Sequence, residues 1–328
     1  TMIDFSSLKT ALDRLASEDI FVGTSSWKYP GWIGQLYQPE RYKFRGKFSK
    51  SRFQDSCLEE YADIFRTVCV DASYYRFPSE RYLAALAEKS PSDFRFSHKV
   101  TDTITIKNFP SHKRHGDFSG QPNPCYLNAD IFLQSFLSPL VPFRERTGLI
   151  IFEFSRFYPR DYQAGREFVS DLDSFLSKLP TSEWDFGVEI RNPSLLQKPY
   201  FDTLDRHSVG HVYNQWQRMP DLHEQLKLKQ PNPETSPTGC RLLLKRGRNY
   251  DEAVEAFMPY DRTVEVRQRV RQASANLIHH LQKTSPGRRA YLYANNRLEG
   301  NALATIHAIL ALLGENDPDD HPQIASIL

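Results

Sequence analysis

Short apolar runs alternate with longer segments of helical periodicity along most of the chain. Runs of this length, set between polar segments, are typical of strands buried in a parallel sheet. Eight of them predict strands: Ile20–Ser25, Thr67–Ser73, Phe94–Val100, Gly148–Phe154, Phe186–Arg191, Ser208–Asn214, Cys240–Lys245 and Ala290–Asn295.

Helical periodicity fills most of the intervals between these runs. In Arg52–Phe65, apolar side chains recur three or four residues apart, which places them on one face of a helix. The other predicted helices are Ser6–Ala16, Ser79–Glu88, Ile131–Leu140, Tyr162–Leu179, Thr263–Leu281 and Asn301–Leu313.

Eight alternating units predict the fold. In a chain of 328 residues they favour a closed (β/α)8 barrel, the TIM-barrel fold, over an open doubly wound sheet. No glycine-rich loop follows the first strand, which argues against a dinucleotide-binding or P-loop fold. We expect a single domain over residues 1–328, with an N-terminal helix in residues 1–18 and a loosely held tail at residues 315–328.

Three long insertions interrupt the minimal barrel pattern. Trp27–Ser51 is aromatic and basic, Thr101–Asn128 contains His112 and His115, and Gln215–Gly239 is rich in proline and polar residues. All three follow the C-terminal ends of predicted strands, the face on which barrels carry their chemistry. We therefore expect them to surround a site.

Alternation within the strands decides which side chains face the barrel interior. In Phe186–Arg191 the apolar residues occupy every second position, so Glu189 and Arg191 fall on the inward set. His98 and His211 have the opposite parity and are expected to face outward. A polar inward residue lies near the end of each of the other seven predicted strands: Ser25, Asp71, Lys99, Glu153, Asn214, Lys245 and Asn295.

Such a ring of charged side chains has two interpretations. A buried charge left unpaired costs several kcal/mol, so the ring must be paired, hydrated or bound to a ligand. One interpretation is an internal ion-pair network, in which Glu189 pairs with Arg191 and Lys99 with Asp71. The other is a pocket for a polar ligand, since characterised barrel enzymes have their active sites on this face.

Composition narrows the class of protein. Hydrophobic residues make up 40% of the chain and charged residues 25%, and the formal net charge is +2. This near balance does not predict attraction of the whole protein to nucleic acid or membrane. No stretch approaches the ~20 apolar residues of a membrane helix, and the charged N-terminal segment does not have the pattern of a signal peptide. Four cysteines without a CxxC pair, Cys57, Cys69, Cys125 and Cys240, predict reduced thiols in a cytoplasmic protein.

Motifs at the strand ends resemble those of a known family. The chain resembles the domain of unknown function 72 family, over almost its whole length, in GTSSWKYPGWIGQLYQP at Gly23–Pro39, SYYRFPS at Ser73–Ser79, FRFSHKV at Phe94–Val100, GVEIRNPS at Gly187–Ser194 and NNRLEGNA at Asn295–Ala302. The resemblance implies a TIM barrel of unsettled activity, loosely likened to barrels related to sugar isomerases.

Several positions depart from the family pattern. Cys69 and Asp71 stand in the second strand, where the family usually has Glu and Asn, and Glu153–Phe154–Ser155 replaces a Gln-Leu-Pro run. The His-Gly motif of the seventh strand is not evident in LLLKRGRNY. If the family's reaction uses those groups, the resemblance implies that this member has altered or lost it.

The first functional hypothesis is an enzyme for a small polar or anionic substrate, such as a phosphorylated or carboxylated sugar-like compound. Glu189 is the main candidate for a general acid or base, with Asp71 and Glu153 as further candidates. Positive charge for a phosphate or carboxylate group is offered by Lys99, Arg191, Lys245 and Arg76.

Amide and aromatic side chains complete the predicted pocket. Asn295 and Asn296 are candidates for orienting hydroxyl groups. Ser25 and Asn214 are further polar candidates at strand ends. Trp27, Tyr29, Trp32 and Tyr75 either stack on a ligand or pack the long loop against the barrel rim.

Two variants of this hypothesis involve covalent or metal chemistry. Lys99 could form a Schiff base, but the nearby acids favour a protonated lysine in an ion pair. Asp71, Glu153 and Glu189 could hold magnesium or manganese, although no histidine shares their inward sets. We predict no cofactor and no metal ligands, with a divalent ion as the alternative.

Two other classes of function remain open. The first insertion carries Lys43, Arg45, Lys47, Lys50 and Arg52 with aromatic residues between them, as in proteins that hold single-stranded nucleic acid. A solvated loop is the simpler interpretation of such a segment. A sensor that binds a small molecule without turnover is the third hypothesis, and the sequence leaves the oligomeric state open.

Overall fold

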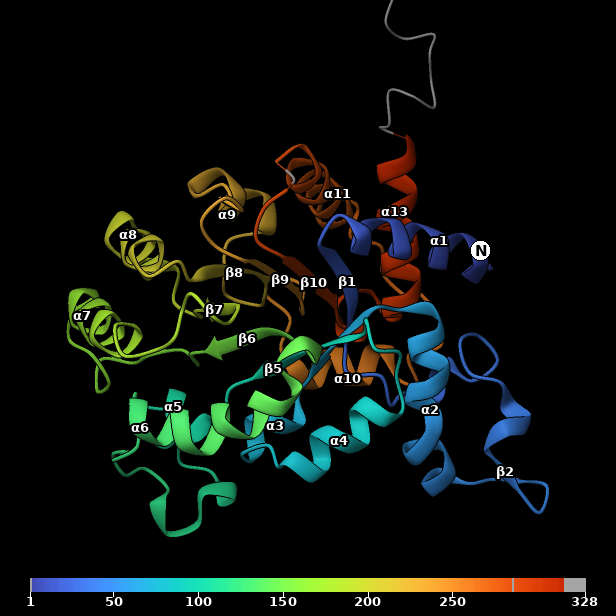
Figure 1. Cartoon of the computed structure of the whole chain (residues 1–328), viewed down its shortest axis with the longest axis horizontal. Coiled ribbons are helices and arrows are strands. Elements are labelled where there is room, and N and C mark those ends of the chain that lie inside the picture. Colours follow the sequence, from blue (N-terminus) through green and yellow to red (C-terminus); the bar gives the residue numbers. More distant parts are fainter. Residues whose placement is uncertain (1, 285, 316–328) are drawn as a thin grey trace, which may run out of the picture.

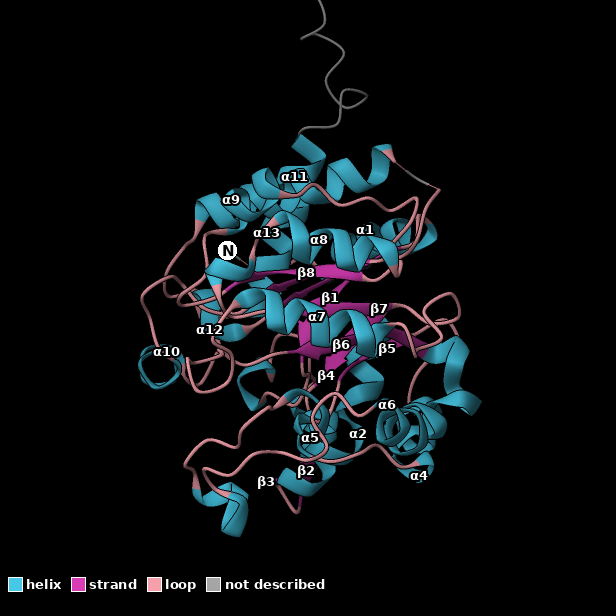
Figure 2. Cartoon of the chain, turned by 90° about the vertical axis from the view of Figure 1, so that its left-hand side faces the viewer, coloured by secondary structure: helices cyan, strands magenta, loops and turns pink. Residues whose placement is uncertain are grey.

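Eight parallel strands close into a barrel in the computed structural model, which describes residues 2–284 and 286–315. The strand order around the barrel is β1-β10-β9-β8-β7-β6-β5-β4, and β4 pairs with β1 to close it. Helices surround the strands (Figures 1 and 2), so the predicted (β/α)8 fold is confirmed. The barrel strands are β1 Ile20–Ser25, β4 Thr67–Val70, β5 Arg95–Lys99, β6 Thr147–Glu153, β7 Phe186–Glu189, β8 Gly210–Gln215, β9 Thr238–Leu242 and β10 Ala290–Ala294.

The helices follow the strands along the chain. Several begin at side chains that accept hydrogen bonds from the first free backbone N–H groups. Asp4 accepts from Ser6 N at 3.0 Å, and Ser79 accepts from Tyr82 N at 3.2 Å. The α-helices are α1 Phe5–Ser17, α2 Lys50–Ile64, α3 Ala72–Tyr75, α4 Glu80–Glu88, α5 Asp102–Thr105, α6 Ala129–Ile131, α7 Gly165–Leu176, α8 Lys198–Arg206, α9 Leu222–Leu228, α10 Tyr250–Phe257, α11 Gln268–Lys283, α12 Asn296–Glu299 and α13 Ala302–Glu315.

The strand alternation separates two apolar layers. Outward side chains pack against the surrounding helices. Glycine is required where backbones approach closely: a Cβ on Gly23 would lie 2.2 Å from the carbonyl oxygen of Thr67. The interior of the barrel is filled by Phe21, Cys69, Leu149, Ile151, Val212, Tyr291 and Tyr293.

Some predicted elements end earlier than their apolar patterns. The strand predicted at Thr67–Ser73 stops at Val70, and the next residues turn into α3. The helix predicted at Ile131–Leu140 is α6 followed by a π-helical turn and a 3-10 segment, because Pro139 and Pro142 cannot donate the backbone hydrogen bonds of a regular helix.

The insertions contain regular structure that the sequence pattern did not predict. Gln215–Gly239 includes α9 and the first residues of β9. Trp27–Ser51 includes a small antiparallel hairpin, β2 Lys43–Phe44 and β3 Lys47–Phe48, which lies beside α2 at the edge of the molecule (Figure 1).

Two other predictions concern the C-terminal tail and membrane-spanning helices. The predicted tail at 315–328 lies outside the described residues except for Glu315, the last residue of α13. Among the described helices, none combines the length and the apolar character needed to cross a bilayer.

Candidate functional site

Inward charges from the ends of β5, β6, β7 and β9 meet at the C-terminal mouth of the barrel. Glu189 is fully buried, and its Oε2 lies 2.6 Å from Arg191 Nη2. Arg241 Nη1 lies 3.1 Å from Glu189 Oε1 and 2.5 Å from Glu153 Oε2. Lys99 Nζ lies 3.0 Å from the same Glu153 oxygen. Strand alternation therefore predicted correctly that Lys99, Glu153, Glu189 and Arg191 share one space.

Arg241 is the member of this cluster that the sequence analysis missed. The prediction placed Lys245 at the inward end of the seventh strand, and this was wrong because β9 ends at Leu242. Beyond that point the chain turns away, and Lys245 pairs with Glu265 at 3.0 Å. Arg241 has the same parity as Lys245, so a charged residue that interrupts the run GCRLLLK was the available signal.

Asp71 completes the cluster at its edge. Its Oδ1 lies 4.0 Å from Lys99 Nζ and 3.9 Å from Arg241 Nη2, and its side chain is 34% exposed. The cluster then holds three cations, Lys99, Arg191 and Arg241, against three carboxylates, Asp71, Glu153 and Glu189. It is balanced in charge, as the ion-pair interpretation predicted.

The charges of this cluster shift the pKa values of its members. Burial by itself would raise the pKa of the Glu153 carboxyl, but Lys99, Arg191 and Arg241 outweigh it and hold that pKa well below its ordinary value. Burial would lower the pKa of Lys99, but Glu153 and Asp71 keep it above its ordinary value. A protonated Lys99 is a poor nucleophile, so the Schiff-base variant is disfavoured.

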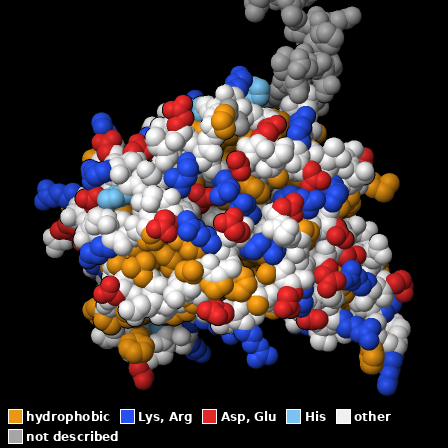
Figure 3. Space-filling model, in the orientation of Figure 1, with side chains coloured by type: hydrophobic (Ala, Val, Ile, Leu, Met, Phe, Trp, Pro, Cys, Tyr) orange, Lys and Arg blue, Asp and Glu red, His pale blue; other side chains and the backbone are white. Residues whose placement is uncertain are grey.

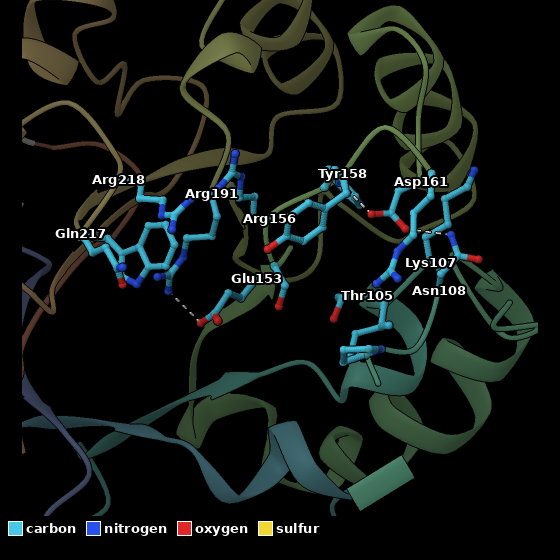
Figure 4. Close-up of a pocket in the computed structure, with 16 residues that line it drawn as sticks. Thr105, Lys107, Asn108, Glu153, Arg156, Tyr158, Asp161, Arg191, Gln217 and Arg218 are labelled. Atoms are coloured by element: carbon cyan, nitrogen blue, oxygen red, sulfur yellow. Dashed lines mark hydrogen bonds and ion pairs between the residues drawn. The ribbon is translucent and has the colours of Figure 1, made fainter. Parts of the chain in front are cut away.

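A cavity of about 500 Å³ opens beside the cluster. Its wall is built from the loops that follow β5, β6 and β8 and from the end of β7. Glu153 and Arg191 are the members of the cluster that line it. In Figure 4 the ring of Tyr158 lies between these two side chains and the group formed by Lys107, Asn108 and Asp161.

Cationic side chains dominate this cavity. The acids on its wall are Glu153 and Asp161, and Asp161 accepts hydrogen bonds from Asn108 Nδ2 and the backbone N–H of Tyr158, both at 2.7 Å. On the face shown in Figure 3, in contrast, acidic and basic side chains are interspersed. The basic residues on the wall are Lys107, Arg156, Arg160, Arg191 and Arg218.

Three of these arginines lack a counter-charge. Within residues 2–284 and 286–315, Arg156, Arg160 and Arg218 form no ion pair. Arg156 and Arg160 both contact the ring of Tyr158, with guanidinium carbons 5.2 and 5.8 Å from its centroid. No sequence pattern marked these loop residues, because they lie outside the regular elements.

Neighbouring side chains hold the cavity wall in place. The guanidinium of Arg191 lies 4.6 Å from the ring centroid of Trp216, a cation–π contact that fixes both residues. The side chain of Asn192 accepts a hydrogen bond from Phe157 N at 2.8 Å and donates one to Phe157 O at 2.9 Å. The loop after β6 is therefore tied to the end of β7.

The predicted amide residues hold the barrel rim together. Asn214 Nδ2 donates to Ile190 O at 3.0 Å. Asn295 Oδ1 accepts from the backbone N–H of Arg297 at 2.9 Å and so begins α12. Asn296 is also buried: its Oδ1 accepts from Ala302 N and from the indole of Trp32, and it does not line the cavity.

Ser25 and Trp27 are likewise buried, at 1% and 4% exposure. The Ser25 hydroxyl and the Trp27 indole N–H have no hydrogen-bond partner among the described residues. Neither residue lines the cavity, so the structure does not place them with Glu153 and Arg191. Tyr29 packs against Trp32, with ring centroids 4.8 Å apart, in agreement with the packing interpretation.

Two further predicted binding residues point elsewhere. Arg76 is exposed and lines a separate cavity beside α3 and α4. Tyr75 is 61% exposed and lies under Arg114. The preceding residue, Tyr74, faces the cluster instead, because α3 rotates the side chains that a strand would have alternated; Lys99 Nζ lies 4.3 Å from its ring centroid.

The acidic and cysteine side chains near the barrel mouth are poorly suited to metal binding or thiol chemistry. No group of three or more His, Cys, Asp or Glu side chains in the described part of the chain is arranged to hold a metal ion. Glu153 and Glu189 face cations, which would compete with a divalent ion. Burial raises the pKa of the Cys69 thiol to about 12, which favours a packed thiol over a reactive one.

Comparisons with known proteins point to the same family as the sequence motifs. Residues 21–326 match the model of "Protein of unknown function DUF72". The UPF0759 protein YecE of Escherichia coli strain K12 is 26% identical over 180 residues, which cover 55% of this chain and 51% of that protein. The chain thus spans about half the length of the curated relatives it matches.

Solved structures extend the similarity to the fold. A DUF72 family protein of Enterococcus faecalis V583 has a TM-score of 0.61 and 16% identity, and the match covers 90% of this chain and 95% of that one. A DUF72 family protein of Thermotoga maritima MSB8 has a TM-score of 0.57 and 19% identity, with coverages of 90% and 99%. At these identities the similarity supports the barrel fold alone, and the chemistry has to be argued from the residues of the site.

Proposed function

We propose that this chain, which belongs to the DUF72 family of proteins of unknown function, is a barrel enzyme that binds a small anionic compound in the cavity beside Glu153. The compound carries a phosphate or carboxylate group together with hydroxyl groups. It is held by the loops at the C-terminal ends of β5 to β8.

One observation carries this proposal: the cavity wall has three arginines that form no ion pair with any described residue. The buried cluster below is balanced, so it offers little net attraction to an anion. Arg156, Arg160 and Arg218 supply that attraction from the rim. Guanidinium groups bind phosphate and carboxylate oxygens through paired N–H donors, which gives both charge and geometry.

The floor of the cavity supplies a fixed polar contact. Glu153 stays ionised because Lys99, Arg191 and Arg241 surround it, so it can accept hydrogen bonds from hydroxyl groups of the ligand. Glu189 lies deeper, and both of its oxygens are engaged by arginines. We therefore assign Glu189 and Lys99 to positioning Glu153 and Arg191 rather than to contact with the ligand.

The test is anion binding measured by thermal unfolding and by titration calorimetry. Inorganic phosphate, sugar phosphates and small dicarboxylates are compared with chloride at constant ionic strength. A ligand at ~100 times its Kd stabilises the folded state by roughly 2.7 kcal/mol. Arg156→Gln combined with Arg218→Gln should weaken binding, whereas Arg14→Gln combined with Arg81→Gln removes the same charge at exposed sites away from the cavity.

The outcomes separate the alternatives. Weaker binding by the cavity variant, with the control unchanged, supports the anion site. Equal binding by all three proteins excludes it. A bound sugar phosphate that is converted to product, followed by phosphorus NMR, identifies an enzyme, and tight binding without conversion identifies a sensor.

A specific observation keeps nucleic acid as the second candidate. On the β2–β3 hairpin, Phe44 and Phe48 are 51% and 49% exposed, and the guanidinium of Arg52 lies 4.8 Å from the Phe44 centroid. Exposed rings beside cations are how single strands are stacked and held. The test is retention of a labelled single-stranded oligonucleotide by the immobilised protein. Retention that falls with salt and is lost in the Phe44→Ala, Phe48→Ala variant would support this function. Equal retention by the variant would exclude the hairpin as the binding site.

A further inference from the structure

A second cavity, of about 280 Å³, lies between the end of β8, the loop after β9 and the first residues of α11. It is distinct from the cavity beside Glu153, and no residue lines both. Its charged and amide wall residues are Gln215, Asp221, Lys245, Arg246, Arg267, Gln268 and Arg269.

Positive charge is in excess around this cavity. Lys245 Nζ and Arg248 Nη1 lie 3.0 and 2.6 Å from the carboxylate of Glu265, and Arg267 contacts the same group. Three cations therefore share one carboxylate. Although burial would raise the pKa of Glu265, hydrogen bonds from these cations lower it to about 2, so the carboxylate stays ionised and the excess is two charges.

Two more arginines add to this excess. Arg246 has a single long ion pair, to Glu224 at 3.9 Å, and Arg269 has none within the described ranges. The one acid on the wall, Asp221, already accepts a hydrogen bond from Gln215 Nε2 at 2.8 Å. The wall thus offers several guanidinium donors, against the single carboxylate of Asp221 among its lining residues.

The start of α11 adds backbone donors to the same wall. This helix runs for 16 residues, and the side chain of Arg267 at its N-cap makes no capping hydrogen bond. The backbone N–H groups of Gln268 and Arg269 have no acceptor among the residues described, and both residues line the cavity. Free N–H groups and the helix dipole favour an anion at this end.

We propose that this cavity is a second oxyanion site that takes a phosphoryl group, with Arg246 and Arg269 as its principal cations. The N–H groups of Gln268 and Arg269 complete the donor set. Its lining residues are all different from those of the first cavity, although the two walls are joined by a hydrogen bond of 2.8 Å from Gly247 N to the carbonyl oxygen of Gln217. The site therefore stands whether or not the proposed function of the first cavity holds.

The experiment measures phosphate binding to the full chain at constant ionic strength. Arg156→Gln and Arg218→Gln are introduced first, so that the cavity beside Glu153 contributes less to the binding that is measured. Arg246→Gln and Arg269→Gln are then added to that protein, and Arg14→Gln and Arg81→Gln are added to a parallel control of equal charge. Inorganic phosphate and pyrophosphate are the probes, read by thermal unfolding and calorimetry.

We expect the protein that carries Arg246→Gln and Arg269→Gln in addition to the first two substitutions to bind phosphate about tenfold more weakly than its control. This factor corresponds to the loss of about one charge-assisted contact. Crystals soaked in tungstate should show anomalous density between Arg246 and Arg269. Equal phosphate affinity in the two proteins overturns the proposal, as does tungstate density confined to the first cavity. Because Arg246 and Arg269 are exposed, both variants should fold, and matching circular dichroism spectra would verify this.

Discussion

The guanidinium of Arg241 donates to the carboxylate of Glu153 at 2.5 Å, across the centre of the barrel mouth. The two residues are 88 positions apart in sequence and lie on β9 and β6. The same Nη1 also reaches Glu189 at 3.1 Å, so one arginine holds two carboxylates. This contact fixes the floor on which the candidate site is built.

Arg241→Met should destabilise the fold strongly. It leaves Glu153 and Glu189 with one cation fewer in a buried position, and removing one partner of a buried ion pair costs about 3–5 kcal/mol. Urea denaturation gives the free energy of unfolding directly. Arg241→Lys keeps the charge but not the paired donors, so it should lose less stability. Exposed Arg81→Met should change the free energy of unfolding by under about 0.5 kcal/mol. A wild-type value for Arg241→Met would mean that the cluster does not stabilise the barrel.

Glu153→Gln should tighten binding of inorganic phosphate. The change removes one negative charge from the cavity floor and leaves Lys99 and Arg191 less neutralised. We expect the affinity to rise about threefold to tenfold, while the free energy of unfolding falls because the cluster is no longer balanced. Calorimetry with phosphate measures the first effect and urea denaturation the second. Weaker phosphate binding would show that the ligand needs the Glu153 carboxylate itself.

Two buried histidines should make the protein less stable in mild acid. Burial lowers the pKa of His98 to about 4 and that of His211 to about 3. The unfolded chain takes up these protons near its ordinary pKa of about 6.5, so the stability present above that pH is lost as the pH falls toward 4. For His98 the full loss is about 3 kcal/mol.

His98→Gln should therefore flatten the pH dependence. The free energy of unfolding is measured by urea denaturation between pH 7 and pH 4.5, and its slope against pH is compared with that of the wild type. Exposed His112→Gln is the matched control and should keep the wild-type slope. An unchanged slope in His98→Gln would mean that His98 is protonated in the folded state as readily as in the unfolded chain.

Trp216 should report on ligand binding. Its ring lies 4.6 Å from the Arg191 guanidinium on the cavity wall, so an anion that draws Arg191 away changes the surroundings of the indole. Trp216→Leu should abolish the fluorescence response and weaken anion binding about fivefold, the loss of a contact of about 1 kcal/mol. Trp184→Phe, just before β7 and therefore at the opposite end of the barrel, should keep the response. A response lost in Trp184→Phe instead would place the ligand away from this cavity.

The barrel and much of its charged floor could be predicted from the order of residues along the chain. Alternating strand and helix patterns are local properties, and eight of them close into one architecture. Parity along each strand is also local, because successive side chains point to opposite faces. This is why Lys99, Glu153, Glu189 and Arg191 could be grouped from sequence before any contact was known.

The position of the cavity, and the set of charged residues that form no ion pair within the described residues, depend on how distant segments pack together. Lys245 and Arg241 share a parity, and the end of β9 at Leu242, which depends on packing against neighbouring strands, assigns one to a loop and the other to the floor. Arg156 and Arg218, which have no ion-pair partner in the described part of the chain, come from loops without periodicity. Their approach depends on how those loops pack, and no local pattern records distances between segments so far apart in the chain.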